Sequence, residues 1–116
     1  MSFWRDDVVG CALSHETRRH IEEQRALIAA HPADPRPYLN LARLYRMEGR
    51  REEALGLLLE SVRLDPGFAG AHADLAELYA VLGDSRAAWR HARAAAQAGD
   101  PRAAHLLRRH DVAPPE

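Results

Sequence analysis

A short apolar motif occurs twice in this chain, and the two copies lie 34 residues apart. Leu41, Ala42, Leu44 and Tyr45 in the first copy correspond to Leu75, Ala76, Leu78 and Tyr79 in the second. Three further pairs keep the same spacing: Pro32 with Pro66, Gly49 with Gly83, and Ala54 with Ala88. Internal repeats of about 20–50 residues are typical of solenoids, in which each unit buries its apolar face only by stacking on a neighbour.

Apolar residues at helical spacing, interrupted by glycine and proline, predict helices along the whole chain. We expect helices at about 15–30, 37–48, 51–64, 69–82, 85–98 and 102–109. Ser14 is expected to cap the first of them, and Gly10 weakens residues 3–13 as a helix. No segment shows the alternation of apolar and polar residues that is typical of a strand.

The repeated unit resembles the tetratricopeptide repeat. That family places Trp-x-x-Leu-Gly-x-x-Tyr on the first helix of a pair, Gly at the turn, and Ala-x-x-x-Phe-x-x-Ala before a closing Pro. The first copy reads Tyr38-x-x-Leu41-Ala42-x-x-Tyr45, Gly49, Ala54-x-x-x-Leu58-x-x-Ser61, Pro66. The second reads His72-x-x-Leu75-Ala76-x-x-Tyr79, Gly83, Ala88-x-x-x-Ala92-x-x-Ala95, with Asp100 in place of the closing Pro. The resemblance covers residues 35–102. It implies an all-α fold, a right-handed superhelical stack of antiparallel helix pairs, in a small stand-alone module of bacterial type.

The length of 116 residues favours a single domain over residues 1–116. The predicted division is one repeat at 35–68, a second at 69–102, and a C-terminal capping helix and tail at 103–116. Residues 1–34 form either a degenerate first repeat or an N-terminal cap. Trp4 lies 34 residues before Tyr38, but Asp7, Cys11 and His15 stand where the next copy has Leu41, Tyr45 and Gly49.

The overall charge gives little reason to expect a nucleic-acid partner. The net charge is −1, and all sixteen basic residues are arginine. Contacts to phosphate need an excess of positive charge, so we expect no nucleic-acid binding. No apolar run approaches the roughly 20 residues of a membrane span, so we expect no membrane partner. The single cysteine, Cys11, fits a reducing compartment, which predicts a cytoplasmic protein.

Seven histidines raise the question of a metal or cofactor site. Cys11 and His15 are four residues apart and would share one helix face, but two ligands do not complete a zinc site. The chain also lacks a glycine-rich phosphate loop and a recognisable nucleophile motif. We therefore expect no cofactor, no metal, no catalytic residues and no enzymatic activity. A metal- or haem-binding helical protein that uses its histidines remains an alternative.

The resemblance implies that the first helix of each pair lines a concave groove. Transferred by register, the predicted peptide-binding groove comprises Arg36, Leu39, Asn40, Arg43, Arg46, Met47, Asp74 and Glu77. Some members of the family hold a C-terminal carboxylate with asparagine and basic residues, and Asn40 resembles one of those asparagines. Gly70 and Asp74 stand where further bases would be required, which argues against such a clamp. A mutual ion pair is the alternative interpretation of Arg43 and Asp74.

The function predicted from the resemblance is that of a protein–protein interaction module or scaffold, which binds a peptide or protein segment in its concave groove. The first alternative is a self-assembling scaffold, a homo-oligomer that forms through the N-terminal segment. Phe3 and Trp4 would then supply core that two repeats alone lack, in their own chain or in a second copy. RNA binding by a related helical-hairpin repeat is disfavoured by the neutral charge and the strict spacing.

Overall fold

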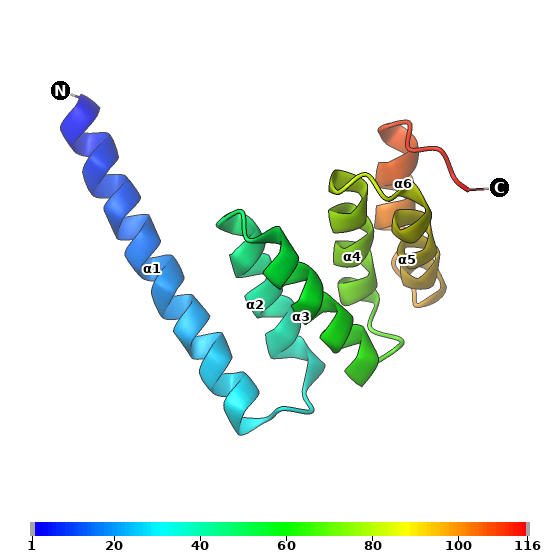
Figure 1. The fold of residues 1–116 in the computed structure, drawn as a ribbon, viewed down its shortest axis with the longest axis horizontal. Coiled ribbons are helices and arrows are strands. Elements are labelled where there is room, and N and C mark those ends of the chain that lie inside the picture. The colour runs from blue at the N-terminus through cyan, green and yellow to red at the C-terminus, as the bar shows by residue number, and fades with distance from the viewer. Residues whose placement is uncertain (1, 116) are drawn as a thin grey trace.

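The computed structural model describes the backbone of residues 2–115 and the side chains of residues 15–115. Within this part of the chain it contains six helices and no strand. The helices are α1 (Ser2–Ala30), α2 (Pro35–Met47), α3 (Arg51–Leu64), α4 (Ala69–Val81), α5 (Ser85–Gln97) and α6 (Arg102–Arg109). The prediction of an all-α fold is confirmed, and the five helices after α1 lie within two residues of their predicted bounds (Figure 1).

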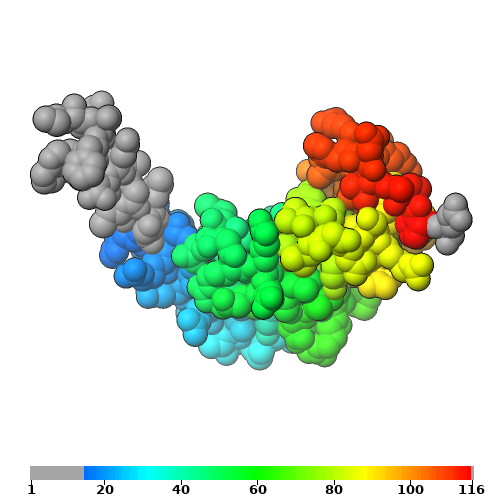
Figure 2. Space-filling model, turned by 45° about the horizontal axis from the view of Figure 1, so that its top comes forward, coloured from blue at the N-terminus to red at the C-terminus, as the bar shows by residue number. Residues whose placement is uncertain are grey.

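The helices stack in the order of the sequence. α1 packs on α2, α2 on α3, α3 on α4, and α4 on α5, while α6 packs on both α4 and α5. Figure 2 shows that the described part of the chain follows an arc, with α1 at one end and α6 at the other. This arrangement of consecutive helix pairs is a tetratricopeptide-like α-solenoid.

The turn inside each helix pair is built in the same way. Gly49 and Gly83 have φ of 79° and 86°, in the left-handed region that glycine adopts without steric cost. The next residue in each case donates its N–H back to the last turn of the helix: Arg50 N to Tyr45 O at 2.8 Å, and Asp84 N to Tyr79 O at 2.9 Å. These are Schellman caps, which explains why glycine recurs at this position of the repeat.

Helices α2 and α6 both begin within the same three-residue motif, Asp-Pro-Arg. The carboxylate of Asp34 accepts a hydrogen bond from the backbone N–H of Arg36 at 3.1 Å, and Asp100 accepts one from that of Arg102 at 3.1 Å. Proline costs little at such a position because the first turn of a helix has no partner for its N–H. The motif therefore fixes where α2 and α6 start.

The N-terminal helix differs from the expectation. Ser14 does not cap a helix that starts at His15, because α1 is continuous from Ser2. No proline interrupts residues 2–30, and a single interior glycine, Gly10, costs only about 1 kcal/mol. The side chains of residues 1–14 lie outside the described residues, and with them the proposed roles of Phe3, Trp4 and Cys11. The division of residues 1–34 stays a prediction.

The described core forms two clusters, one that joins α1, α2 and α3 to α4 and one between α4, α5 and α6. Leucines dominate the first cluster, which centres on Leu41, Leu58 and Leu75 and includes Ile21 of α1. The second consists mainly of alanines from α4, α5 and α6 packed around Trp89. Ala54 and Ala88 are both fully buried, as expected of small residues where two helices approach closely. None of the helices, over the described residues, is long and apolar enough to cross a membrane.

Candidate functional site

Helices α2, α4 and α6 jointly border one hollowed surface of the stack. One polar hollow of about 180 Å³ is bordered by Arg43 of α2, by Gly70, Ala73, Asp74 and Glu77 of α4, and by Asp100, Arg102 and Ala103 at the start of α6. Two larger hollows adjoin it, of about 390 and 360 Å³, and Glu77 lines all three. Glu77 is therefore at the centre of a continuous hollowed surface that three helices share.

Arg43 and Asp74 form the best-defined ion pair of this surface. Arg43 donates from Nε to Asp74 Oδ2 at 2.6 Å and from a terminal nitrogen to Oδ1 at 3.3 Å. The Asp74 side chain is only 13 % exposed, whereas that of Arg43 is 52 % exposed. The hydrogen bond to Asp74 raises the pKa of Arg43 above its ordinary value. The geometry agrees with the interpretation of these two residues as a mutual ion pair that links α2 to α4.

Further ion pairs extend along the same surface. Arg46 lies 3.7 Å from Glu77, which makes a second link between α2 and α4. Arg102 pairs with Asp100 at 2.8 Å, and this contact together with the backbone N–H of Arg102 lowers the pKa of Asp100 to about 2. The surface thus carries charges of both signs, and the partners in its three described arginine–carboxylate pairs lie within ion-pair distance of each other.

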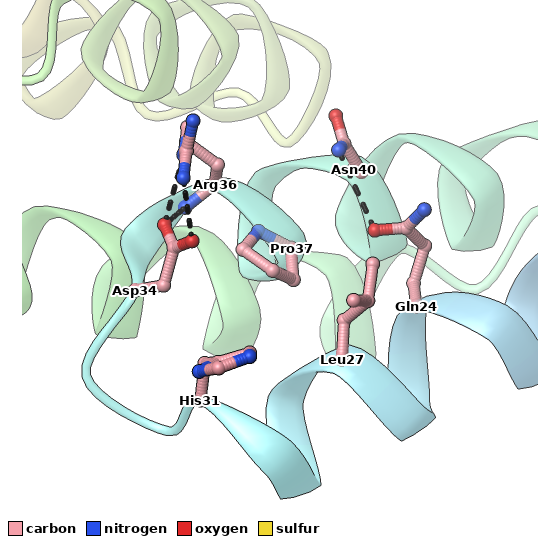
Figure 3. A pocket seen from close by; sticks show the side chains of 7 residues that line it. All are labelled: Gln24, Leu27, His31, Asp34, Arg36, Pro37 and Asn40. Carbon is pink, nitrogen blue, oxygen red and sulfur yellow. Dashed lines mark hydrogen bonds and ion pairs between the residues drawn. The ribbon is translucent and has the colours of Figure 1, made fainter.

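A separate hollow of about 470 Å³ lies between α1 and α2, bordered by Gln24, Leu27, His31, Asp34, Arg36, Pro37 and Asn40. Figure 3 shows Arg36 and Asn40 pointing from α2 to the same side, while Gln24, Leu27 and His31 approach from α1. Asn40 donates to the Gln24 amide oxygen at 3.4 Å, and Arg36 is held by both carboxylate oxygens of Asp34. Two of the predicted groove residues therefore border this hollow rather than the one around Glu77.

One predicted groove residue requires a correction. Leu39 is only 5 % exposed and belongs to the apolar core. It lies beneath α4, because a Cβ added to Gly70 would be 3.3 Å from Leu39 Cδ2. Asp74 is also buried, although its carboxylate reaches Arg43, and the other predicted residues are accessible or partly so, with Met47 75 % exposed at the end of α2. The structure brings Arg43, Arg46, Asp74 and Glu77 together, and it leaves Arg36 and Asn40 beside α1.

Several residues that border these hollows were missed in the sequence. They come from α6 and the following tail, and they are Arg102, His105, Leu106, Leu107, Arg109, His110 and Val112. The sequence pattern predicts only a capping helix and tail for residues 103–116. The repetition of Asp34-Pro35-Arg36 as Asp100-Pro101-Arg102 marks the start of another inner helix and would have pointed to them.

Among the described histidines, His72 and His91 meet in the interior of the second repeat. Their Nδ1 atoms are 3.0 Å apart, and His72 Nε2 is 2.7 Å from the carbonyl oxygen of Pro66. A carbonyl only accepts, so His72 Nε2–H donates to it, and the bare Nδ1 of neutral His72 accepts from His91 Nδ1–H. Tyr79 stacks on His91 with ring centroids 5.6 Å apart. Burial lowers the pKa of His91 to about 4, and the neighbouring His72 and Arg90 add to the effect.

This histidine pair does not complete a metal site. In the part of the chain whose side chains are described, no three His, Cys, Asp or Glu residues gather in a way that could hold a metal ion. Two ligands are fewer than structural or catalytic zinc requires. The hydrogen bonds of His72 and His91 to each other and to Pro66 account for them as buried polar groups of the core.

A model of the tetratricopeptide repeat family matches residues 14–96. The chain belongs to the tetratricopeptide repeat family. It is also similar to a TPR repeat-containing thioredoxin, TTL4, of Arabidopsis thaliana, with 41% identity over 73 residues. That match covers 63% of this chain but only 11% of the relative, so the similarity concerns a small part of a much longer protein. Tetratricopeptide repeats in general mediate protein–protein interactions and are not catalytic.

Proposed function

We propose that this tetratricopeptide chain is an interaction module, or scaffold, that binds a segment of a protein partner on its concave face. The observation that carries the proposal is the continuous surface around Glu77, where α2, α4 and α6 border three adjoining hollows. A groove lined by successive helices accommodates an extended or helical peptide, because its side chains can enter separate hollows.

The charges of the groove support recognition of a partner segment that carries both positive and negative groups. The Arg43–Asp74 and Arg46–Glu77 pairs are held across neighbouring helices, so little side-chain entropy is lost when a ligand adds to them. Arg36 and Asn40, in the hollow beside α1, would contact the other end of a long segment. We propose that the module acts by binding alone, without a cofactor or a catalytic step, and that it works in a reducing compartment.

Site-specific photo-crosslinking in the native host tests this function. A photoreactive amino acid is placed at Met47, which is 75 % exposed at the C-terminal end of α2, or at Leu59, which is 40 % exposed on α3. We expect a protein partner to be captured from Met47 and not from Leu59. Capture only from Leu59 would move the interaction to the convex side and contradict the proposal.

A charge-swapped variant then tests whether the groove residues contribute. In the double variant Arg43→Glu with Asp74→Arg, the ion pair is retained while its polarity is reversed. We expect the fold to persist and capture from Met47 to fall, because the partner now meets the opposite charges. Arg86→Glu, at an exposed arginine on α5, is the control and should leave capture unchanged. Unchanged capture by the double variant would exclude Arg43 and Asp74 from the interface.

A further inference from the structure

The C-terminal end of the concave face differs in character from the rest. Its hollow of about 360 Å³ has a floor of Ala80, Val81, Leu106, Leu107 and Val112. Val81 is 56 % exposed and the neighbouring Leu82 44 %, so apolar area is open to solvent here. By contrast, the hollow at Asp74 is bordered mainly by charged groups. An open apolar floor beside a charged groove is a typical place for one bulky side chain of a partner to anchor.

The apolar floor itself is bordered by one charge of each sign, Arg46 and Glu77, and the adjoining hollow adds two arginines. The charged residues that border it and the adjoining hollow of about 390 Å³ are Arg46, Arg102 and Arg109 against Glu77 alone. Arg46 pairs with Glu77 and Arg102 with Asp100. Arg109 has no ion pair with any described residue, and it lies exposed in the last turn of α6. An arginine in this position can form a charge-assisted, bidentate pair with a carboxylate of a ligand.

We infer that this end of the groove selects a partner segment in which a bulky apolar side chain is flanked by carboxylates. The apolar side chain enters the hollow between α4 and α6, and a carboxylate pairs with Arg109. A second copy of this chain is a poorer occupant on its described surface, because the exposed large apolar residues outside this end of the stack, Leu27, Met47 and Leu59, lie on three different helices. The inference rests on the proposed function, since it names the kind of partner that the same concave face accepts.

A titration followed by nuclear magnetic resonance tests it with a defined probe. The full ¹⁵N-labelled chain is titrated with a short synthetic peptide that has a Leu-Phe core flanked by glutamates. Both peptide ends are blocked, so that no terminal carboxylate contributes. A second peptide has the same core flanked by lysines. We expect saturable shifts at the amides of Val81, Leu106 and Val112 with the acidic peptide, and no saturation with the basic one.

Two matched pairs of variants locate the contacts. Arg109→Glu and Val81→Ser should each weaken binding of the acidic peptide by roughly tenfold, since buried anchors dominate such interfaces. Arg86→Glu and Leu59→Ser alter an exposed arginine and an exposed apolar residue elsewhere, and they should leave the affinity unchanged. All four positions are exposed, so the variants are expected to fold, and their amide spectra report whether they do.

Five outcomes would overturn the inference. Four of them are the absence of saturable shifts at millimolar acidic peptide, equal binding of the basic peptide, equal binding by Arg109→Glu, and shifts of the α4 and α6 amides with protein concentration alone. The last would show that a second copy covers this face. Peptide shifts confined to amides near Arg43 and Asp74 would reject this inference while leaving the proposed function intact. Crosslinking from Leu59 alone would reject the proposed function, independently of whether the acidic peptide binds.

Discussion

The two repeats share one backbone plan but use different side chains at matching positions. Tyr38 donates its hydroxyl to the carbonyl oxygen of Pro32 at 2.8 Å. His72, 34 residues later, makes the equivalent contact to Pro66 through Nε2 at 2.7 Å. A phenol and an imidazole thus donate to equivalent proline carbonyls in the two repeats. The comparison shows that the repeat requires a hydrogen-bond donor of suitable reach at this position rather than one residue type.

The outer helices differ more strongly than the inner ones. Leu55, Leu57 and Leu58 of α3 correspond by register to Trp89, His91 and Ala92 of α5. In the first repeat the core between helices is filled by leucines, as around the fully buried Leu58. In the second it is filled by one tryptophan, small alanines and a pair of histidines. The second repeat therefore depends on a few large or polar groups, and it should respond to changes that the first repeat tolerates.

The largest expected effect comes from Trp89. It is 2 % exposed, and its indole N–H donates to the carbonyl oxygen of Val112 at 2.9 Å, which ties the C-terminal tail to α5. Trp89→Ala should lower the free energy of unfolding by about 3–5 kcal/mol, measured by urea denaturation. Leu55→Ala, at the matching but partly buried position, should cost less. Equal losses of unfolding free energy for Trp89→Ala and Leu55→Ala would show that the two repeats depend equally on the side chain at this register position.

The histidine pair should make the stability of the chain depend on pH. The pKa of His91 is about 4 in the folded chain against 6.5 for an ordinary histidine, so the unfolded chain binds the proton more readily between these values. Stability is therefore complete above about pH 6.5 and falls as the pH decreases towards 4. The loss is on the order of 3 kcal/mol. Thermal melting across this pH range measures it.

A double variant attributes that pH dependence to the pair. His72→Tyr with His91→Leu restores the residues that the first repeat has at Tyr38 and Leu57, and tyrosine can still donate to Pro66. We expect the melting temperature of this variant to change much less between pH 6.5 and 4. His20→Gln, at an exposed position on α1, is the control and should retain the wild-type slope. An unchanged slope in the double variant would assign the effect to other groups.

Overpacking at the helix turn should have a smaller effect. Ala88 is fully buried where α5 approaches α4, so Ala88→Leu should destabilise the chain by about 1–3 kcal/mol. Ala96→Leu, on the exposed side of the same helix, is the matched control and should be nearly neutral. The midpoint of urea denaturation measures both. An unchanged midpoint for Ala88→Leu would mean that α4 and α5 leave space for a larger side chain at this position, although Ala88 is fully buried.

The smallest effect is expected at the link between the two repeats. Arg43→Glu places a second carboxylate opposite Asp74, whose side chain is largely buried. Because Arg43 itself is half exposed, water screens the interaction, and we expect a loss of about 1 kcal/mol. The charge swap Arg43→Glu with Asp74→Arg should recover most of it. If the swap is no more stable than the single variant, direct pairing does not hold these helices together.

The sequence predicted the helices after α1 because each boundary depends on local chemistry. Gly49 and Gly83 end helices through left-handed backbone, and Asp34 with Pro35 starts one. The start of α1 was wrong because Ser14 is a good cap only where a helix begins, and no breaker stops the helix upstream. Local patterns show where a helix can begin or end, but they do not show whether a helix actually begins or ends at each of these positions.

The groove could be predicted only in part. Register placed Arg43, Arg46, Asp74 and Glu77 on one surface, because residues 34 apart share a face of the stack. It failed at Leu39, whose burial depends on the small size of Gly70 on the next helix. The residues of α6 and the pairing of His72 with His91 were missed, because both depend on contacts between helices that no single repeat contains.

Amide hydrogen exchange with a captured partner tests the central claim, that the inner helices bind and the outer helices support them. Exchange is measured for the chain alone and in complex with the protein crosslinked from Met47. We expect the partner to slow exchange in α2, α4 and α6 and to leave the exposed sides of α3 and α5 unchanged. Protection confined to α3 and α5, or to the two ends of the stack, would contradict the account.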